Sequence, residues 1–270
     1  AGLTAEFADV NGDPAGSTTV EINNRGAQLG QRNEDGDERI HEVGTLDIQN
    51  VEDVTVDVQD GSANIQELDA QDATSISVNG SRSVAIGVGS DDVIQAGSGE
   101  GAFVDSFRDI DNSIGQADTL ESVDASGVAG QFTGVLVDNL EQDFQFTGSN
   151  VGNALDIGTH DSDNAISLTV ETGDGTDGVL LRTIGDTATT GGDNADDESL
   201  ELDLGDGDDI LFVGGNIDPR IQSSGNEIDL GGGTDEIRAS NPTMNPISFD
   251  ISGAALSGVE SVRLEGNTTL

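Results

Sequence analysis

The chain has 270 residues, 53 of them acidic and only 9 basic, which gives a formal net charge of −44 at pH 7. All the basic residues are arginines, and the chain has no Cys, Trp or Tyr. A surface this acidic excludes binding to a nucleic-acid backbone or to anionic lipid. No stretch approaches the run of about 18 apolar residues that a membrane-spanning helix needs.

Apolar residues make up 33% of the chain and are spread along its whole length. This spacing is not that of a disordered acidic tail, and it predicts a folded protein with a thin core. Repulsion among the carboxylates must be offset, either by bound divalent cations or by a saline medium. Arginine without lysine and a large excess of acids also resemble proteins from halophilic cells. The first residue, Ala1, is what we expect of a mature secreted protein or of a fragment.

The predicted elements are strands. Residues 1–45 are expected to form an irregular N-terminal cap or surface segment, and residues 46–270 to hold the regular part of the fold. Alternation of apolar and polar residues, the signature of half-buried strands, occurs at 45–50, 54–59, 74–80, 166–172, 199–205 and 226–232. No segment sustains helical periodicity over three turns, and the 38 glycines would break a long helix. The chain is therefore predicted to be all-β.

A short sequence motif, G-x-G-x-D-x-apolar, occurs four times, at 87–93, 173–179, 205–211 and 231–237. The composition alone predicts roughly 0.2 copies by chance. The last three copies each follow an alternating strand and lie about 30 residues apart. Strand, glycine turn and strand repeated at this distance predict a parallel β-solenoid (β-helix or β-roll-like) with loop insertions, whose coils bury their inner side chains against each other.

A second and weaker repeat, apolar-Glu-x-Val, occurs at 51–56, 120–125 and 259–264. Because a short motif of this kind recurs easily in an acidic chain, it is weak evidence for a structural repeat.

The four glycine–aspartate motifs contain the kinds of oxygen ligand that a calcium site needs. Glycine brings backbone carbonyls close to a point outside a turn, and Ca²⁺ takes six to eight oxygen ligands from carbonyls and carboxylates. One turn supplies too few, so the turns of neighbouring coils must combine, and coils stacked in register would place the aspartates in one column. The predicted ligand residues are Gly87, Gly89, Asp91, Gly173, Asp174, Gly175, Asp177, Gly205, Asp206, Gly207, Asp209, Gly231, Gly233 and Asp235.

Other interpretations of the same turns remain open. A single Gly-Asp-Gly is an ordinary tight turn; four copies with Asp in fixed phase favour calcium, because aligned carboxylates need a counter-charge. A phosphate-binding loop is excluded, since no Lys completes the motif and strands, not helices, follow the glycines. Catalysis is not expected. The chain has two histidines, His41 and His160, and both are predicted to have solvent-exposed side chains.

The four G-x-G-x-D-x-apolar motifs resemble the calcium-binding nonapeptide G-G-x-G-x-D-x-U-x of RTX (repeats-in-toxin) proteins from its second glycine onward. The first glycine is replaced, and the copies are not in tandem. With segments such as 119–137 and 255–266, the pattern is similar to bacterial surface-layer and large secreted adhesin proteins. The resemblance implies an extracellular, calcium-dependent structural protein of the cell surface that assembles with copies of itself into a lattice or filament. An adhesin or ligand-binding module of a larger secreted protein is the alternative, and a β-helical polysaccharide-active enzyme comes third.

Overall fold

The computed structural model describes residues 16–23, 40–59, 61–70, 72–87, 120–136, 143–157, 167–181, 199–214, 227–240, 247–248, 255–265 and 268–269. These residues form strands and turns, and none of them lies in a helix. The all-β prediction is confirmed for this part of the chain. Its main feature is a pair of parallel sheets of nine strands each.

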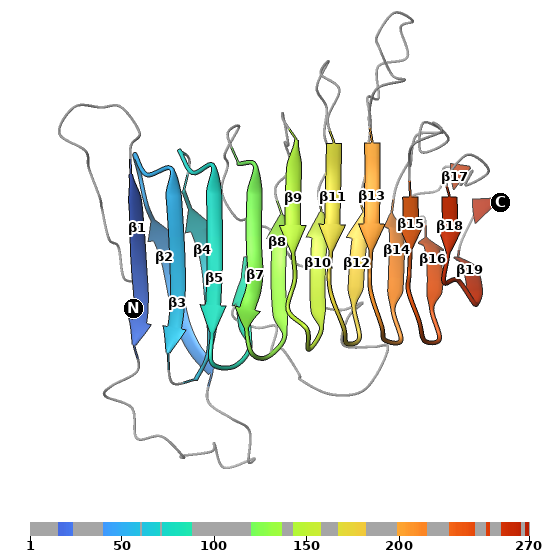
Figure 1. The fold of residues 1–270 in the computed structure, drawn as a ribbon, viewed down its shortest axis with the longest axis horizontal. Helices are drawn as coiled ribbons and strands as arrows, with labels where there is room; N and C mark the ends of the chain where they lie inside the picture. The colour runs from blue at the N-terminus through green and yellow to red at the C-terminus, as the bar shows by residue number, and fades with distance from the viewer. Residues whose placement is uncertain are drawn as a thin grey trace, which may run out of the picture.

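The front sheet in Figure 1, here sheet A, contains every other strand of the chain. In spatial order its strands are β1 (Ser17–Asn23), β3 (Asp53–Gln59), β5 (Ser75–Gly80), β7 (Ser122–Val128), β9 (Phe144–Thr147), β11 (Ser167–Glu171), β13 (Ser199–Asp203), β15 (Glu227–Asp229) and β18 (Ala255–Ser257).

The second sheet, sheet B, contains the strands between them. These are β2 (Ile40–Asp47), β4 (Ser62–Asp69), β6 (Val84–Ile86), β8 (Phe132–Leu136), β10 (Asn153–Ile157), β12 (Gly178–Leu181), β14 (Ile210–Gly214), β16 (Glu236–Ser240) and β19 (Ser261–Glu265). A separate pair is formed by β17 (Ile247–Ser248) and β20 (Thr268–Thr269).

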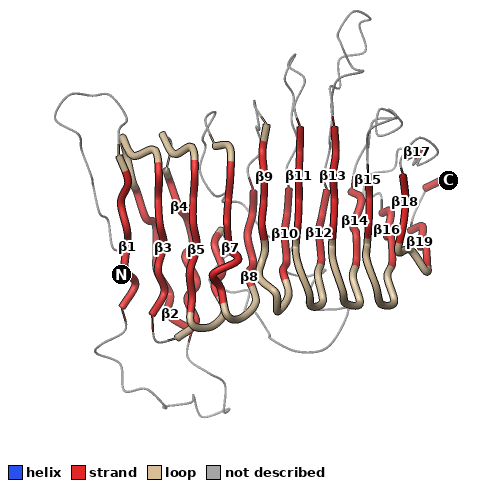
Figure 2. Tube along the Cα trace, viewed as in Figure 1, coloured by secondary structure: helices blue, strands red, loops and turns tan. Residues whose placement is uncertain are grey.

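The chain alternates between the two sheets, so each pair of successive strands makes one coil. It runs along a sheet A strand, turns, and returns along a sheet B strand, and the next coil lies beside it (Figure 1). We call the edge where sheet A strands lead into sheet B strands the turn edge, and the opposite edge the loop edge. The described connections of the turn edge are short and stack closely (Figure 2).

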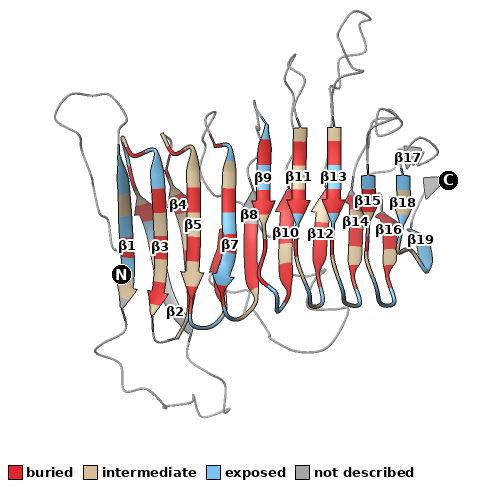
Figure 3. Cartoon of the chain, in the orientation of Figure 1, coloured by how far each residue is buried: buried red, intermediate tan, exposed pale blue. Residues whose placement is uncertain are grey.

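Buried apolar residues of both sheets form one core between the layers. Figure 3 shows that buried residues occur on strands of both sheets. Because neighbouring strands pair in parallel register, equivalent positions stack: Val170 of β11 is opposite Phe146 of β9 on one side and Leu202 of β13 on the other. The rings of Phe132 and Phe146 stack across the core, 5.7 Å apart. Each coil thus buries its apolar side chains against its neighbours rather than within itself.

The two sheets present different outer faces. The strands of sheet A contain acidic residues but no basic one, and their outward positions are mostly Ser, Thr, Asp and Glu. On sheet B, outward positions near the C-terminal end include Leu180, Phe212 and Arg238, which face one another across adjacent strands. The guanidinium of Arg238 lies 5.5 Å from the ring centre of Phe212 and 2.6 Å from Glu236.

Strands β1 and β2 lie partly or wholly within residues 1–45, the segment that the sequence assigns to a cap. β1 pairs with β3 over seven residues, and β2 pairs with β4. The sheets therefore begin before residue 46. In the part of the chain that is described, no helix is long and apolar enough to span a membrane.

Candidate metal site

Three connections at the turn edge have the same length and the same conformation at their first glycine. We call residues 172–177, 204–209 and 230–235 the glycine turns; they join β11 to β12, β13 to β14 and β15 to β16. Their first glycines, Gly173, Gly205 and Gly231, have φ angles of +83°, +81° and +82°. These angles lie in the left-handed region, which a side chain disfavours.

Close stacking of the coils is a further reason for glycine in these turns, at the second glycine as well as at the first. A Cβ atom on Gly207 would lie 1.5 Å from the carbonyl oxygen of Gly175, and one on Gly233 would lie 1.5 Å from that of Gly207. Backbone hydrogen bonds also join the turns directly: Gly175 N–H donates to the Asp206 carbonyl at 2.7 Å, and Gly207 N–H to the Gly232 carbonyl at 2.8 Å. The G-x-G pattern thus has a steric cause.

The last residue of each glycine turn is an aspartate that points into the protein. Asp177, Asp209 and Asp235 expose 1%, 0% and 0% of their surface. One carboxylate oxygen, Oδ1, accepts the backbone N–H of the equivalent residue in the preceding coil: Asp177 N–H donates to Asp209 at 2.7 Å, and Asp209 N–H donates to Asp235 at 2.8 Å. The three residues form a continuous column, which we call the aspartate ladder.

The other oxygen of each carboxylate has no donor. Oδ2 of Asp177, of Asp209 and of Asp235 is buried and has no hydrogen-bond partner in the described part of the chain. A buried polar atom without a partner costs about 1–3 kcal/mol, and more when it is charged. Three such atoms in successive coils imply that a proton or a cation balances the ladder.

Burial changes the acidity of the ladder. The pKa of Asp209 is raised to about 8, mainly by loss of solvent. The N–H bond from Asp177 opposes the rise, and the neighbouring charges of Asp177 and Asp235 contribute to it. Loss of solvent likewise raises the pKa of Asp177 to about 7, although hydrogen bonds from Asn153 oppose the change. The pKa of Asp235 is raised for the same main reason, burial.

The ladder has one further member at each end, and the sequence analysis missed both. On the N-terminal side, Asn153 follows the turn 148–152, and both its backbone N–H and its side-chain amide donate to Asp177. On the C-terminal side, Glu260 accepts the Asp235 N–H at 2.7 Å. The sequence signal for Asn153 is its position directly after a turn bounded by Gly148 and Gly152. The sequence signal for Glu260 is the weak repeat at 259–264.

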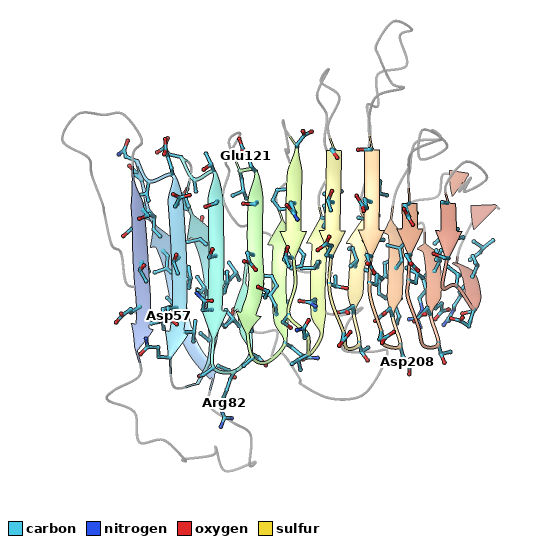
Figure 4. The ribbon with its side chains drawn as sticks, viewed as in Figure 1. Asp57, Arg82, Glu121 and Asp208 are labelled. Atoms are coloured by element: carbon cyan, nitrogen blue, oxygen red, sulfur yellow. The ribbon has the colours of Figure 1, made fainter. Side chains whose placement is uncertain are left out.

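The remaining predicted ligand residues lie elsewhere. Asp174 and Asp206 are exposed on the outside of their turns, not with the buried aspartates. Asp208, also exposed, lies among the turns in Figure 4. Gly87 follows β6 and so lies at the loop edge, opposite the glycine turns. Gly89 and Asp91 lie outside the described residues.

The donor set of the ladder is made of hard oxygens. Within the described ranges, no three His, Cys, Asp or Glu side chains are grouped closely enough to hold a metal ion by themselves. A site here must combine the unpartnered Oδ2 atoms of the ladder with backbone carbonyls of the glycine turns. Carboxylate and carbonyl oxygens in flexible number are the ligands that Ca²⁺ takes, so the residues fit a calcium-type cation.

No protein-family model matches the chain, and neither the curated proteins nor the solved structures compared with it show a significant match.

Proposed function

We propose that the chain is an extracellular structural protein of the cell surface, built as a β-solenoid whose coils are tied together by calcium at the glycine turns. The observation that carries the proposal is the aspartate ladder with its three buried Oδ2 atoms that lack donors. In this role the protein acts by assembling with copies of itself, and it performs no catalysis.

Calcium would act on the ladder as a counter-charge. Asp177, Asp209 and Asp235 would hold it together with carbonyls of the glycine turns, and its positive charge would stabilise carboxylates that burial otherwise disfavours. Because the ladder crosses from coil to coil, each ion would contact two coils. The cation would therefore stabilise the stacking of coils, which supplies most of the buried apolar contacts of the fold.

Calorimetry with and without a chelator at fixed ionic strength tests the calcium proposal. With calcium at about 100 times the dissociation constant, one site adds about 2.7 kcal/mol. In a chain of this size, that raises the melting temperature by roughly 5–10 °C. Magnesium at the same ionic strength is the control for screening. A melting temperature that EGTA leaves unchanged contradicts the calcium proposal.

Self-assembly is supported by the last described coil. Val262 and Leu264 of β19 expose 40% and 38% of their surface. They are aligned with Ile237 and Ala239 of β16, which are buried in the core. Among the described strands, β18 and β19 also have no neighbour on one side within the two main sheets. An unpaired parallel edge with apolar inward positions is a template for another coil, here from a second copy.

Sedimentation velocity in calcium tests the assembly proposal. The wild-type chain is expected to form oligomers that grow with protein concentration, and the variant Val262→Glu/Leu264→Glu to stay monomeric. Thr169→Glu, an outward change on the middle of sheet A, is the charge control and keeps the wild-type behaviour. A chain that is monomeric in calcium yet binds a glycan or a cell surface would instead favour the adhesin alternative.

A further inference from the structure

We infer that Asn153 ends the calcium-binding part of the turn edge, because its side-chain amino group occupies the place between two turns that a cation takes in later coils. This inference rests on the proposed calcium function. It concerns one interface, between the turn 148–152 and the glycine turn 172–177.

The surroundings of the Asn153 amino group resemble a cation site. Its Nδ2 atom donates to the carbonyl oxygens of Ser149 at 2.9 Å and Thr172 at 2.8 Å, and to Oδ1 of Asp177 at 2.8 Å. Two carbonyls and one carboxylate thus converge on a single nitrogen. Its Oδ1 atom accepts the Ser149 N–H at 2.8 Å. The two hydrogens of Nδ2 are shared among these three acceptors, and the amide meets them without an added charge.

The next coil has equivalent residues but not the donor. By the register of the coils, Asp177 stands where Asn153 stands, and Leu204 stands where Thr172 stands. A carboxylate in the ionised form has only acceptor oxygens to offer. One of those oxygens, Asp177 Oδ2, is buried and receives no hydrogen bond. Replacing the amino group by an oxygen leaves acceptors facing acceptors, which is the arrangement that a cation resolves.

At the second interface, between the glycine turns 172–177 and 204–209, a neutral hydroxyl supplies one hydrogen-bond donor. Thr172 Oγ1 donates to the Leu204 carbonyl at 2.9 Å. At the third interface the residue in the position of Thr172 is Leu204, which has no polar side-chain atom. The side-chain donors between the turns therefore decrease toward the C-terminus: the amide of Asn153 at the first interface, the hydroxyl of Thr172 at the second, and none from Leu204 at the third.

The substitution Asn153→Asp tests the inference, because it converts the first interface to the pattern of the later ones. Isothermal titration with calcium is expected to show one additional bound ion relative to wild type. In EGTA the variant should melt below wild type, since a carboxylate then faces two carbonyls and Asp177. Calcium should restore most of that loss, so the calcium-induced rise in melting temperature exceeds the wild-type rise.

Asn79→Asp is the matched control, with the same change of charge on the outer face of sheet A, where it is expected to leave the number of bound ions unchanged. The inference is overturned if wild type binds calcium but Asn153→Asp binds the same number of ions and is equally destabilised with calcium and without it. A wild-type chain that binds no calcium overturns the proposed function together with this inference. The two failures are therefore distinguishable.

Discussion

At the scale of single residues, the ladder aspartates are unusual because one oxygen of each carboxylate accepts a hydrogen bond and the other, although buried, accepts none. Oδ1 of Asp209 accepts the Asp177 N–H, so the side chain is held in place, while Oδ2 receives no donor. Asn153 shows how the same position is filled when no charge is needed. The difference between one nitrogen and one oxygen should decide how the molecule responds to calcium.

The variant Asp209→Asn should separate the two roles. In EGTA it is expected to melt at or above the wild-type temperature, because an amide has no charged form that burial disfavours and can donate as that of Asn153 does. In calcium it should lose most of the stabilisation that wild type gains. Calorimetry measures both. Asp206→Asn, an exposed position in the same turn, should respond as wild type does; equal responses of Asp209→Asn and wild type would contradict the role of Asp209.

The raised pKa values predict an unusual dependence of stability on pH. Folded Asp209 has a pKa of about 8 against an ordinary 3.8, so the folded state binds protons more tightly than the unfolded state. In EGTA, stability is therefore greatest below pH 3.8 for this group and falls as the pH rises toward about 8, by on the order of a few kcal/mol.

Urea denaturation at a series of pH values in EGTA measures this slope. Calcium should flatten it, because the cation replaces the proton as counter-charge. The Asp209→Asn variant serves as the reference, since it lacks the titrating group. If its slope equals that of wild type, the carboxylates of the exposed faces, not the ladder, set the pH dependence.

At the scale of elements, the glycine turns are determined by the contact between coils. Gly207→Ala places a Cβ 1.5 Å from the Gly175 carbonyl oxygen, a backbone atom that cannot move without separating the turns. Overpacking of this kind costs about 1–3 kcal/mol, which urea denaturation measures. Gly232→Ala is the control, because its Cβ meets only the Asp206 side-chain oxygen, at 3.0 Å. Equal stability of the two variants would contradict the account of close stacking.

The sequence predicted one sheet far better than the other. The alternating segments 54–59, 74–80, 166–172, 199–205 and 226–232 correspond to β3, β5, β11, β13 and β15, all in sheet A. The sixth predicted strand, 45–50, overlaps only the end of β2 in sheet B, and residues 48–50 are not in a strand. Sheet A alternates because its outer positions are polar. Sheet B strands carry apolar residues outward as well, such as Leu180 of β12, so their alternation is lost and their pairing was not predicted.

The site was predictable only in its spacing. A fixed phase identifies Asp177, Asp209 and Asp235 as equivalent, but burial separates them from Asp174 and Asp206, which the same motifs predicted equally well. Which aspartate faces inward depends on the direction of the turn, and a composition of mostly Gly and Asp does not encode it. Asn153 was missed because its turn has lost the G-x-G pattern.

At the scale of the whole molecule, Asn153 divides two kinds of coil. Toward the N-terminus, the coils up to β9–β10 are joined by backbone ladders and apolar columns, and their described turns hold no aspartate ladder. Toward the C-terminus, the glycine turns add buried carboxylates to the same framework. Removal of calcium should therefore weaken the C-terminal coils first.

Hydrogen exchange with and without EGTA measures that order. Amides of β11–β16 are expected to lose protection in EGTA, while those of β3–β8 keep most of theirs, because local opening follows local stability. Sodium chloride held at a constant high concentration controls for screening of the −44 charge. A uniform loss of protection along the chain would mean that calcium acts on the total charge and not at the glycine turns.

The most direct test is the position of the ion itself. Crystals grown in calcium and measured at a wavelength with strong anomalous scattering from calcium are expected to show a peak about 2.3–2.6 Å from Oδ2 of Asp209, between the glycine turns 204–209 and 230–235. An anomalous map with no peak beside any of the three Oδ2 atoms of the ladder would contradict the account.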